Sequence, residues 1–237
     1  MARSFNGSSQ WMETSSQYPR VNGTIFIAFK PNWNSNDSVD HTLFYCDNGA
    51  SGVFGAQHYS DNNWYVGWQS GSEYRIVVPA ASMSVSSGIW YNLIYRWDDT
   101  TNLSALFLNG LAKGTGSTLA TANLSGQTFL FASLASVLYN GSLGAIALWD
   151  ESLSDSDVAL LGAWRRPDLV DPTNLISYWP LAGTASPEPD SVGGLDLTLV
   201  GSPPQSTPHH TIDTGVQIIS IDYGRFPKHK LAYTPRA

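Results

Sequence analysis

The sequence of 237 residues has one cysteine, few charged residues and no long apolar run. The lone Cys46 cannot form an internal disulfide bond, so packing alone must stabilise the fold. We expect Cys46 to behave as a small, partly buried hydrophobic residue. No stretch reaches the roughly 18 consecutive apolar residues of a membrane-spanning helix, so we expect no membrane insertion.

Charged residues make up only 13% of the chain, compared with roughly 25% in an average domain. The net charge of -7 argues against a nucleic-acid partner, because phosphate binding requires basic surfaces. Aromatic residues reach 12% and include nine tryptophans, so a large core is available. The surface must then consist mainly of Ser, Thr, Asn and Gly, as in many extracellular or particle-surface β-proteins.

The start of the chain shows no export signal. Met1-Ala2-Arg3 leads directly into the strand-like SFNGSSQW, without the apolar segment of a secretory leader. A surface-like composition without an export signal is explained by a virion component that is made in the cytoplasm and assembled onto a particle. A cleaved or incomplete chain would explain it equally.

Short strand patterns repeat along the chain and are separated by turns rich in Gly and Asn. Such regular spacing indicates an all-β sandwich or jelly roll. The expected strands cover residues 3–14, 23–30, 41–46, 52–58, 63–69, 74–78, 90–97, 104–108, 127–134 and 143–149.

Residues 139–164 contain the most specific local pattern. Asn140-Gly141 is a turn signal, and the following LGAIALW is apolar on both alternating faces, as in a strand covered on two sides. Ser154 stands three residues before Asp157, which is the spacing of a helix N-cap. We therefore predict one short helix after this strand, ending near Gly162.

Four segments in order resemble laminin-G-like, pentraxin-related domains of the concanavalin A-like lectin/glucanase superfamily. They are RSFNGSSQWMET, WYNLIYRWDD with LFLNG, YNGSLGAIALW followed by LSD, and LISYWPLAG. The resemblance covers about residues 3–202 and implies a concanavalin A-like jelly-roll sandwich with one short helix, occupying residues 1–202. In many relatives a strand like YWPL precedes the first segment, whereas here it follows the helix. We still expect residues 174–200 to pair into the same sandwich.

The C-terminal part differs in composition. GSPPQSTPHHT at residues 201–211 is a Pro-rich linker, and the unit from 203 to 237 is predicted to be this linker plus an extended basic arm. The arm is expected to dock on other virion proteins or on copies of the same chain; folding back on its own acidic domain, or disorder, is the alternative. Its candidate docking residues are Arg225, Phe226, Lys228, Lys230, Tyr233 and Arg236.

The sequence lacks a recognisable catalytic motif. Glucanases of the superfamily need two carboxylates on one strand, in a pattern such as E-x-D-x-E, and none of the four glutamates has that partner. Asp150 and Glu151 are adjacent and would point to opposite faces of a strand. His209-His210 lies in the Pro-rich linker with no nucleophile nearby. We therefore predict that the protein is not an enzyme.

The resemblance implies one cofactor, a calcium ion held in rim loops by Asp or Asn side chains and backbone carbonyls. The candidate ligands are Asp47, Asp98 and Asp99. Relatives usually carry an acidic residue in the strand after the aromatic-N-G motif, and here Gly144-Ala145 stands in its place. The sequence therefore leaves open whether calcium is bound at all.

Recognition of a sugar requires an aromatic face and polar groups for its hydroxyls. The candidate glycan-binding residues are Trp33, Tyr59, Asn62, Trp64 and Tyr65, with Asn63 beside them. The competing interpretation, which the alternating pattern favours, places Trp64 and Trp68 in the sandwich core. Trp33 lies in a polar loop and is expected to expose its ring.

The sequence thus predicts a non-enzymatic binding or structural protein. The leading hypothesis is an accessory component of a virion surface, of the phage capsid decoration or fibre type, with a lectin-like glycan-binding face. The alternatives are a free or secreted, extracellular lectin and a degenerate glycoside hydrolase of the same fold.

Overall fold

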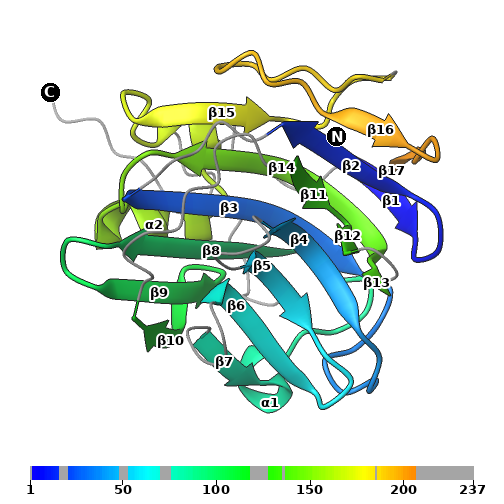
Figure 1. Cartoon of the computed structure of the whole chain (residues 1–237), viewed down its shortest axis with the longest axis horizontal. Helices are drawn as coiled ribbons and strands as arrows, with labels where there is room; N and C mark the ends of the chain where they lie inside the picture. The colour runs from blue at the N-terminus through cyan, green and yellow to red at the C-terminus, as the bar shows by residue number, and fades with distance from the viewer. Residues whose placement is uncertain are drawn as a thin grey trace, which may run out of the picture.

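In the computed structural model, two large antiparallel sheets pack face to face as a sandwich (Figure 1). The structure describes residues 2–15, 21–47, 53–69, 76–117, 128–134, 137–184 and 186–206. This architecture confirms the predicted all-β jelly-roll class. Among the helices of these residues, none is long and apolar enough to cross a membrane.

The first sheet, sheet A, has eight strands. In spatial order they are β10 (Leu111–Gly116), β9 (Leu103–Leu108), β8 (Tyr91–Asp98), β3 (Asn22–Pro31), β14 (Asn140–Trp149), β1 (Ala2–Asn6) and β17 (Gln205–Ser206), with β15 (Leu175–Trp179) also paired to β14.

The second sheet, sheet B, has seven strands. Their order is β16 (Thr198–Val200), β2 (Trp11–Ser15), β11 (Thr128–Phe131), β4 (His41–Asp47), β5 (Val53–His58), β6 (Asn63–Gln69) and β7 (Ile76–Pro79). A short hairpin of β12 (Ser133–Leu134) and β13 (Val137–Leu138) packs next to β4.

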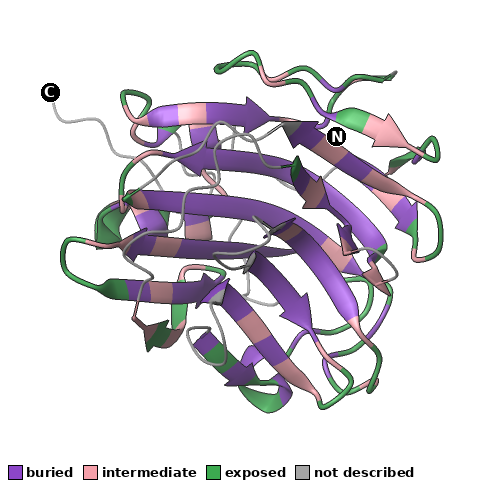
Figure 2. Cartoon of the chain, viewed as in Figure 1, coloured by how far each residue is buried: buried purple, intermediate pink, exposed green. Residues whose placement is uncertain are grey.

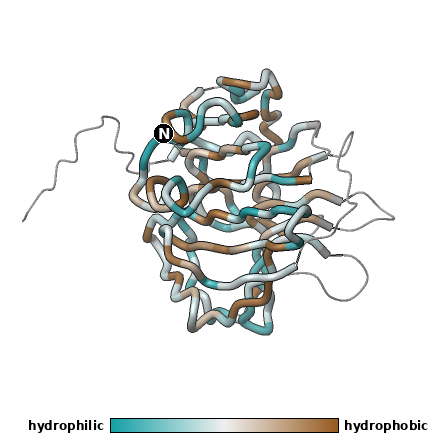
Figure 3. The backbone as a smooth tube through the Cα atoms, turned by 90° about the vertical axis from the view of Figure 1, so that its left-hand side faces the viewer, coloured by the Kyte–Doolittle hydropathy of each residue, from teal (hydrophilic) through white to brown (hydrophobic). Residues whose placement is uncertain are grey.

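The main core lies between the sheets and is dominated by aromatic side chains. Trp64, Trp68 and Phe54 of sheet B pack there with Tyr95 and Phe29 of sheet A. Buried positions run along the central strands of both sheets, and exposed ones gather in the connections (Figure 2). The hydropathy colouring likewise places apolar stretches along the strands (Figure 3). Cys46 packs in this core as a small hydrophobic residue and is more deeply buried than predicted.

A second hydrophobic cluster covers the other face of sheet A. Helix α2 (Asp155–Gly162) and the 3-10 turn η1 (Pro167–Leu169) belong to the segment that lies over β14 and β3. Every residue of β14 from Gly141 to Trp149 is buried, because each face has its own apolar layer. The predicted two-sided strand is therefore confirmed. Ser154 begins α2 as predicted, with its hydroxyl oxygen accepting a hydrogen bond from Asp157 N–H at 3.2 Å.

Several local features differ from the prediction. Residues 3–14 form two strands in different sheets, β1 and β2, because Gly7 turns the chain with a φ of 70°. Asn140-Gly141 is not a turn but the start of β14, where a side chain at 141 would collide with the carbonyl oxygen of Lys30. A further single helical turn, α1 (Ala80–Met83), was not predicted.

The segment after α2 returns to both sheets, as predicted for residues 174–200. Strand β15 pairs with the end of β14, and β16 pairs with β2 of the other sheet. Residues 203–206, predicted to belong to the linker, instead pack on the domain: Pro203 is buried and β17 pairs with β1. The remainder of the predicted linker and arm, from residue 207, lies outside the described residues.

A buried ion pair joins the first strand to this returning segment. Arg3 Nε donates to Glu188 Oε1 at 2.6 Å, and the two residues are only 3% and 1% exposed. The remaining guanidinium nitrogens donate to the carbonyl oxygens of Gly183 and Pro203. The second oxygen of Glu188 accepts from Gly183 N–H at 3.0 Å. Both charges are therefore compensated inside the protein.

We predict that Glu188→Gln or Arg3→Met lowers the free energy of unfolding by about 3–5 kcal/mol, because either change leaves the opposite charge buried without its partner. Replacing both, as in Arg3→Met/Glu188→Leu, should restore part of this loss. Urea denaturation at neutral pH measures the three values.

Asp155→Asn is the matched control. Asp155 pairs with Arg96 at 2.6 Å, but its side chain is 87% exposed, so little change in stability is expected. A double variant at least as unstable as the worse single variant would contradict the ion-pair explanation.

Candidate functional site

One end of the sandwich carries two neighbouring polar connections. The first is the loop of residues 32–40 between β3 and β4, and the second is the turn of residues 59–62 between β5 and β6. We call them the 32–40 loop and the 59–62 turn. They are joined by Asn62, whose Oδ1 accepts from Ser38 N–H and whose Nδ2 donates to Ser38 Oγ, both at 3.0 Å. Asp40 also accepts from Ser60 N–H at 2.6 Å.

Trp33 anchors the 32–40 loop in the core, so the prediction that its ring is exposed is wrong. The residue is 6% exposed, and its ring stacks on His41 with centroids 4.0 Å apart and planes 6° apart. Its other ring neighbours are His58, Trp64 and Tyr139. The loop is polar in sequence but folds its single tryptophan inward, because the open end of the core offers an aromatic pocket.

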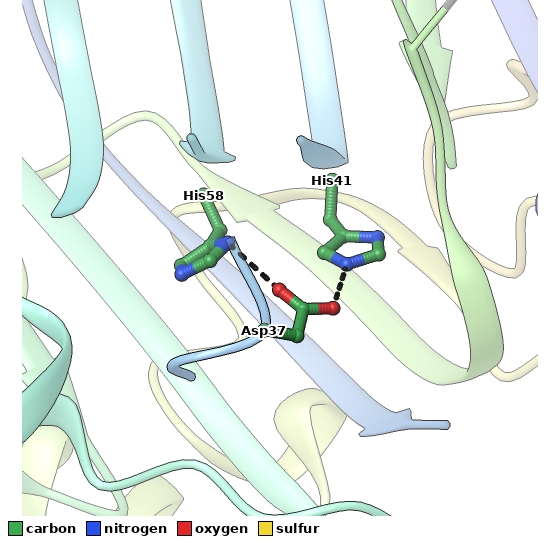
Figure 4. A group of neighbouring side chains, drawn as sticks. All are labelled: Asp37, His41 and His58. Atoms are coloured by element: carbon green, nitrogen blue, oxygen red, sulfur yellow. Dashed lines mark hydrogen bonds and ion pairs between the residues drawn. The ribbon is translucent and has the colours of Figure 1, made fainter. Parts of the chain in front are cut away.

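Asp37, His41 and His58 form a cluster beneath the same loop. His41 begins β4 and His58 ends β5, and the register of these strands places the two directly opposite each other. The Asp37 carboxylate points toward both imidazoles (Figure 4). Its Oδ2 is 2.8 Å from His41 Nε2, and its Oδ1 is 3.9 Å from His58 Nδ1. One ligand-type atom of each side chain lies within 4.8 Å of the others.

The two imidazoles differ in their hydrogen bonds. His58 is fully buried, and both ring nitrogens face backbone carbonyls: Nδ1 is 2.9 Å from Val39 O and Nε2 is 2.8 Å from Ser35 O. His41 Nδ1 is buried and has no hydrogen-bond partner within the described residues. Burial lowers the pKa of His41, although its hydrogen bond to Asp37 opposes the shift.

The 59–62 turn and the strand after it present two half-buried tyrosines on the outer side of sheet B. Tyr65 alternates along β6 with the core residues Trp64 and Val66, so it faces away from the core. The rings of Tyr59 and Tyr65 meet edge to face, with centroids 4.9 Å apart. Tyr65 Oη donates to Asp61 Oδ2 at 2.7 Å. The Tyr65 hydroxyl and the Asn63 amide lower the pKa of Asp61, so this exposed carboxylate is ionised at neutral pH.

A cavity of about 550 Å³ opens beside these two connections. Its walls come from sequence-distant segments: the tip after β1, the 32–40 loop, the 59–62 turn and the β13–β14 region. The lining residues are mainly polar, with an apolar minority from Val39, Val137 and Leu138. Most of the polar lining consists of Asn6, Ser38, Asp40, His41, Ser60 and Asn140.

The structure brings together only part of the predicted glycan-binding set. Tyr59, Asn62 and Tyr65 lie on or beside the 59–62 turn and reach the surface. Trp33 and Trp64 lie behind it in the core, where neither ring can meet a ligand from solution. For Trp64 and Trp68, the competing core interpretation is therefore correct.

The predicted calcium ligands come from strands of both sheets. Asp47 ends β4 of sheet B, whereas Asp98 ends β8 of sheet A. Asp98 Oδ1 accepts from Thr100 N–H at 2.8 Å and so stabilises its own turn. Among the described side chains, the only grouping of three acidic or histidine ligands is the Asp37–His41–His58 cluster. A calcium ion prefers an all-oxygen shell, which this cluster does not offer.

The glutamates, which the sequence did not assign to a catalytic pair, and the predicted docking arm remain to be placed. Glu151 Oε2 accepts from Asn174 on the connection before β15, and Glu188 is committed to Arg3. Glu13 accepts from the Trp11 indole on β2. These three glutamates therefore belong to separate structural contacts. The candidate docking residues from Arg225 to Arg236 lie outside the described part of the chain.

The sequence did not single out Asp37, His41 and His58. A spacing of seventeen residues between the histidines matches no metal-binding motif. A signal was nevertheless present, because strands 41–46 and 52–58 were predicted on either side of a turn. Pairing them around their connection places residue 41 opposite residue 58. The position of Asp37 depends on the loop and carries no such signal.

Comparison with known proteins supports the fold. The model of the concanavalin A-like lectin/glucanases superfamily matches residues 6–159. No curated protein sequence matches the chain. The native heptameric SAP-like pentraxin from Limulus polyphemus is similar in structure, with a TM-score of 0.54 and 19% identity over 68% of this chain and 81% of that one.

Two further solved structures are similar at the same level. The CBM40 of the Ruminococcus gnavus IT-sialidase, bound to α2,3-sialyllactose, has a TM-score of 0.51 and 16% identity, covering 68% of this chain and 96% of that one. Domain 4 of the extracellular GH43 arabinanase AbnA from Geobacillus stearothermophilus, in complex with arabinotriose, has a TM-score of 0.50 and 15% identity, covering 68% and 76%. At such identities the likeness concerns the fold. The family match spans well over half of the sequence, and the chain belongs to the concanavalin A-like lectin/glucanases superfamily.

Proposed function

We propose that this protein is a non-catalytic glycan-binding domain that holds a sugar at the 59–62 turn and in the adjoining cavity. The observation that carries the proposal is the outward-facing Tyr59–Tyr65 pair, flanked by the ionised Asp61 and by Asn62 and Asn63. Together these side chains offer an aromatic surface beside oriented hydrogen-bonding groups.

The chemistry of this surface suits a carbohydrate. A sugar ring has apolar C–H faces that pack on aromatic rings, and hydroxyls that need donors and acceptors. Asp61 is held by Tyr65 and Asn63 and therefore presents its carboxylate in a fixed direction. The cavity of about 550 Å³ falls within the usual range of ligand sites, roughly 300–1,000 Å³. Its mixed lining offers several hydroxyl and amide groups.

The charge of the cavity lining and the 59–62 turn favours neutral glycans. Asp40 lines the cavity and Asp61 lies on the adjoining turn, while the described residues that line the cavity and form the turn include no lysine or arginine. A sialylated ligand would bring a carboxylate next to these acids, which costs free energy. We therefore favour neutral oligosaccharides, the class of the arabinotriose bound by the arabinanase domain, over sialylated ones of the kind bound by the CBM40.

Binding rather than hydrolysis is supported by the carboxylates. Retaining and inverting glycosidases place two carboxyl groups across the scissile bond. At the proposed site, the lowered pKa of Asp61 makes it unsuited to be the general acid, and Asp40 accepts a hydrogen bond from Ser60 N–H within the turn. The degenerate-hydrolase alternative would need measurable cleavage of a β-glucan to be revived.

We predict that Tyr65→Ala weakens binding to the preferred glycan by roughly tenfold or more, because a lost contact worth about 1.4 kcal/mol changes Kd tenfold. Tyr65→Phe keeps the ring and loses only the hydroxyl that orients Asp61, so a smaller loss is expected. A glycan array with the full-length protein identifies the ligand, and calorimetry then compares the variants.

Leu160→Ala is the control, because Leu160 is an exposed residue of α2, on the side of sheet A away from sheet B. It should bind like the wild type. Absence of saturable binding to any neutral or sialylated glycan would contradict the proposed function. Equal binding by wild type and Tyr65→Ala would place recognition elsewhere on the domain.

The biological setting that we propose is the surface of a virion, to which the domain attaches through residues 213–237. Support comes from the sequence alone: four basic residues follow Asp222 with no further acid, next to a domain that is acidic overall. A free or secreted extracellular lectin is the alternative, and it would need no assembly partner.

Deletion of residues 213–237 is expected to abolish association with the particle and to leave the sandwich folded, because the described strands end at Ser206. Co-sedimentation with purified particles measures association, and circular dichroism checks the fold. Association that survives the deletion would refute the role of the arm. Glycan binding should be unchanged in the same variant.

A further inference from the structure

We propose that Asp37, His41 and His58 bind a divalent transition-metal ion such as Zn²⁺, with the carbonyl oxygen of Val39 as a fourth ligand. The site lies beneath the 32–40 loop and ties that loop to the ends of β4 and β5. It differs from the predicted calcium site in its residues, its position and the chemistry of its ligands.

The donor atoms are already close to the arrangement that an ion requires. A carboxylate oxygen and two imidazole nitrogens approach within 4.8 Å of one another, and Val39 O lies 2.9 Å from His58 Nδ1. Ligands about 2.0–2.1 Å from a tetrahedral ion lie roughly 3.3–3.4 Å apart. The separations of Asp37 from His41, 2.8 Å, and from His58, 3.9 Å, fall on either side of this value. Binding of an ion would require side-chain rotations that shorten the longer separations, which reach up to 4.8 Å.

The surroundings of His58 point to a positive centre in the same place. A neutral imidazole has one N–H group, yet both ring nitrogens of this fully buried residue face carbonyl oxygens. If Nε2–H donates to Ser35 O, the lone pair of Nδ1 points toward Val39 O and the Asp37 carboxylate. Three electron-rich atoms then face one another next to the half-buried Asp37, an arrangement that a positive centre between them would stabilise. A metal ion placed there turns each of these atoms into a ligand.

The outer contact of His58 fits that of a metal-bound histidine. Such histidines usually donate their second N–H to a backbone carbonyl or carboxylate, which fixes the tautomer. Ser35 O has this position for His58, at 2.8 Å from Nε2. The Trp33 ring stacks on His41 and limits rotation of its imidazole. Two imidazoles and one carboxylate suit zinc, nickel or copper ions, whereas calcium and magnesium prefer oxygen ligands only.

The experiment is a zinc titration of the untagged, full-length protein after removal of metals with a chelator. Isothermal calorimetry at neutral pH is expected to show one ion per chain, and the metal content after dialysis should agree. Zinc at a hundredfold excess over Kd should also raise the unfolding midpoint by roughly 5 °C or more. Asp37→Asn and His41→Gln each remove a proposed direct ligand and should weaken binding by about a hundredfold. This matches the upper end of the roughly 10- to 100-fold loss that follows removal of a residue that only supports a ligand.

Two control variants locate the ion. Asp40→Asn removes the same charge from the same loop but leaves all the proposed ligands, so it should bind zinc like the wild type. His209→Gln/His210→Gln tests the paired histidines of the Pro-rich segment and should also keep full binding. Zinc binding that is lost in this double variant, but kept in Asp37→Asn and His41→Gln, would overturn the proposal.

A second measurement uses the unaltered protein, in case the ligand variants do not fold. The nitrogen-15 spectrum of the histidine side chains should change at His41 and His58 when zinc is added. Absence of zinc uptake would reject the metal site. Protons on both ring nitrogens of His58 would then show that a proton supplies the positive centre. These readouts do not involve a glycan, so the glycan-binding proposal stands or falls separately.

Discussion

The burial of β14 on both faces governs the placement of the other layers. This strand is apolar throughout, so it needs one hydrophobic layer on each side. Sheet B supplies the first layer, and the segment containing α2 supplies the second. The end of α2 is held in turn by sheet A, where the buried Asn92 amide donates to the carbonyl oxygens of Leu161 and Gly162. A single strand thus determines where the helix must lie.

The same strand positions the functional end of the molecule. Asn140, its first residue, accepts from Asn32 N–H at 3.1 Å, and the side chains of these two residues are joined at 3.0 Å. The 32–40 loop therefore leaves β3 at a point fixed by the neighbouring strand. From there Trp33 enters the core and Ser38 reaches Asn62 on the next connection. The proposed site is built from loops, but each loop is tied to a rigid sheet. Exposed recognition groups acquire a defined geometry in this way.

Local periodicity makes part of this fold predictable from the sequence, and the predictions fail where tertiary contacts decide. Alternation along β6 and β8, and the turn between β4 and β5, identified these strands within a few residues. The spacing of Ser154 and Asp157 identified α2. The division of residues 3–14 between two sheets was missed, because a hydrophobic pattern does not say which sheet a strand joins. Trp33 was misplaced for a related reason. A tryptophan among polar residues looks exposed, and only the folded end of the core shows the space that receives it.

The buried polar cluster explains why this loop has one defined conformation. Apolar residues at positions 37, 41 and 58 would close the end of the core at a lower desolvation cost. Apolar contacts are not directional, however, and would leave the loop free to settle in several arrangements. The contacts of Asp37 with His41 and of His58 with two loop carbonyls are directional, and they set the path of the backbone through Ser35 and Val39. That path presents Ser38 to Asn62 in the left-handed conformation that both residues adopt, with φ values of 58° and 61°. The exposed 59–62 turn and the tip of the 32–40 loop therefore depend on polar groups buried behind them.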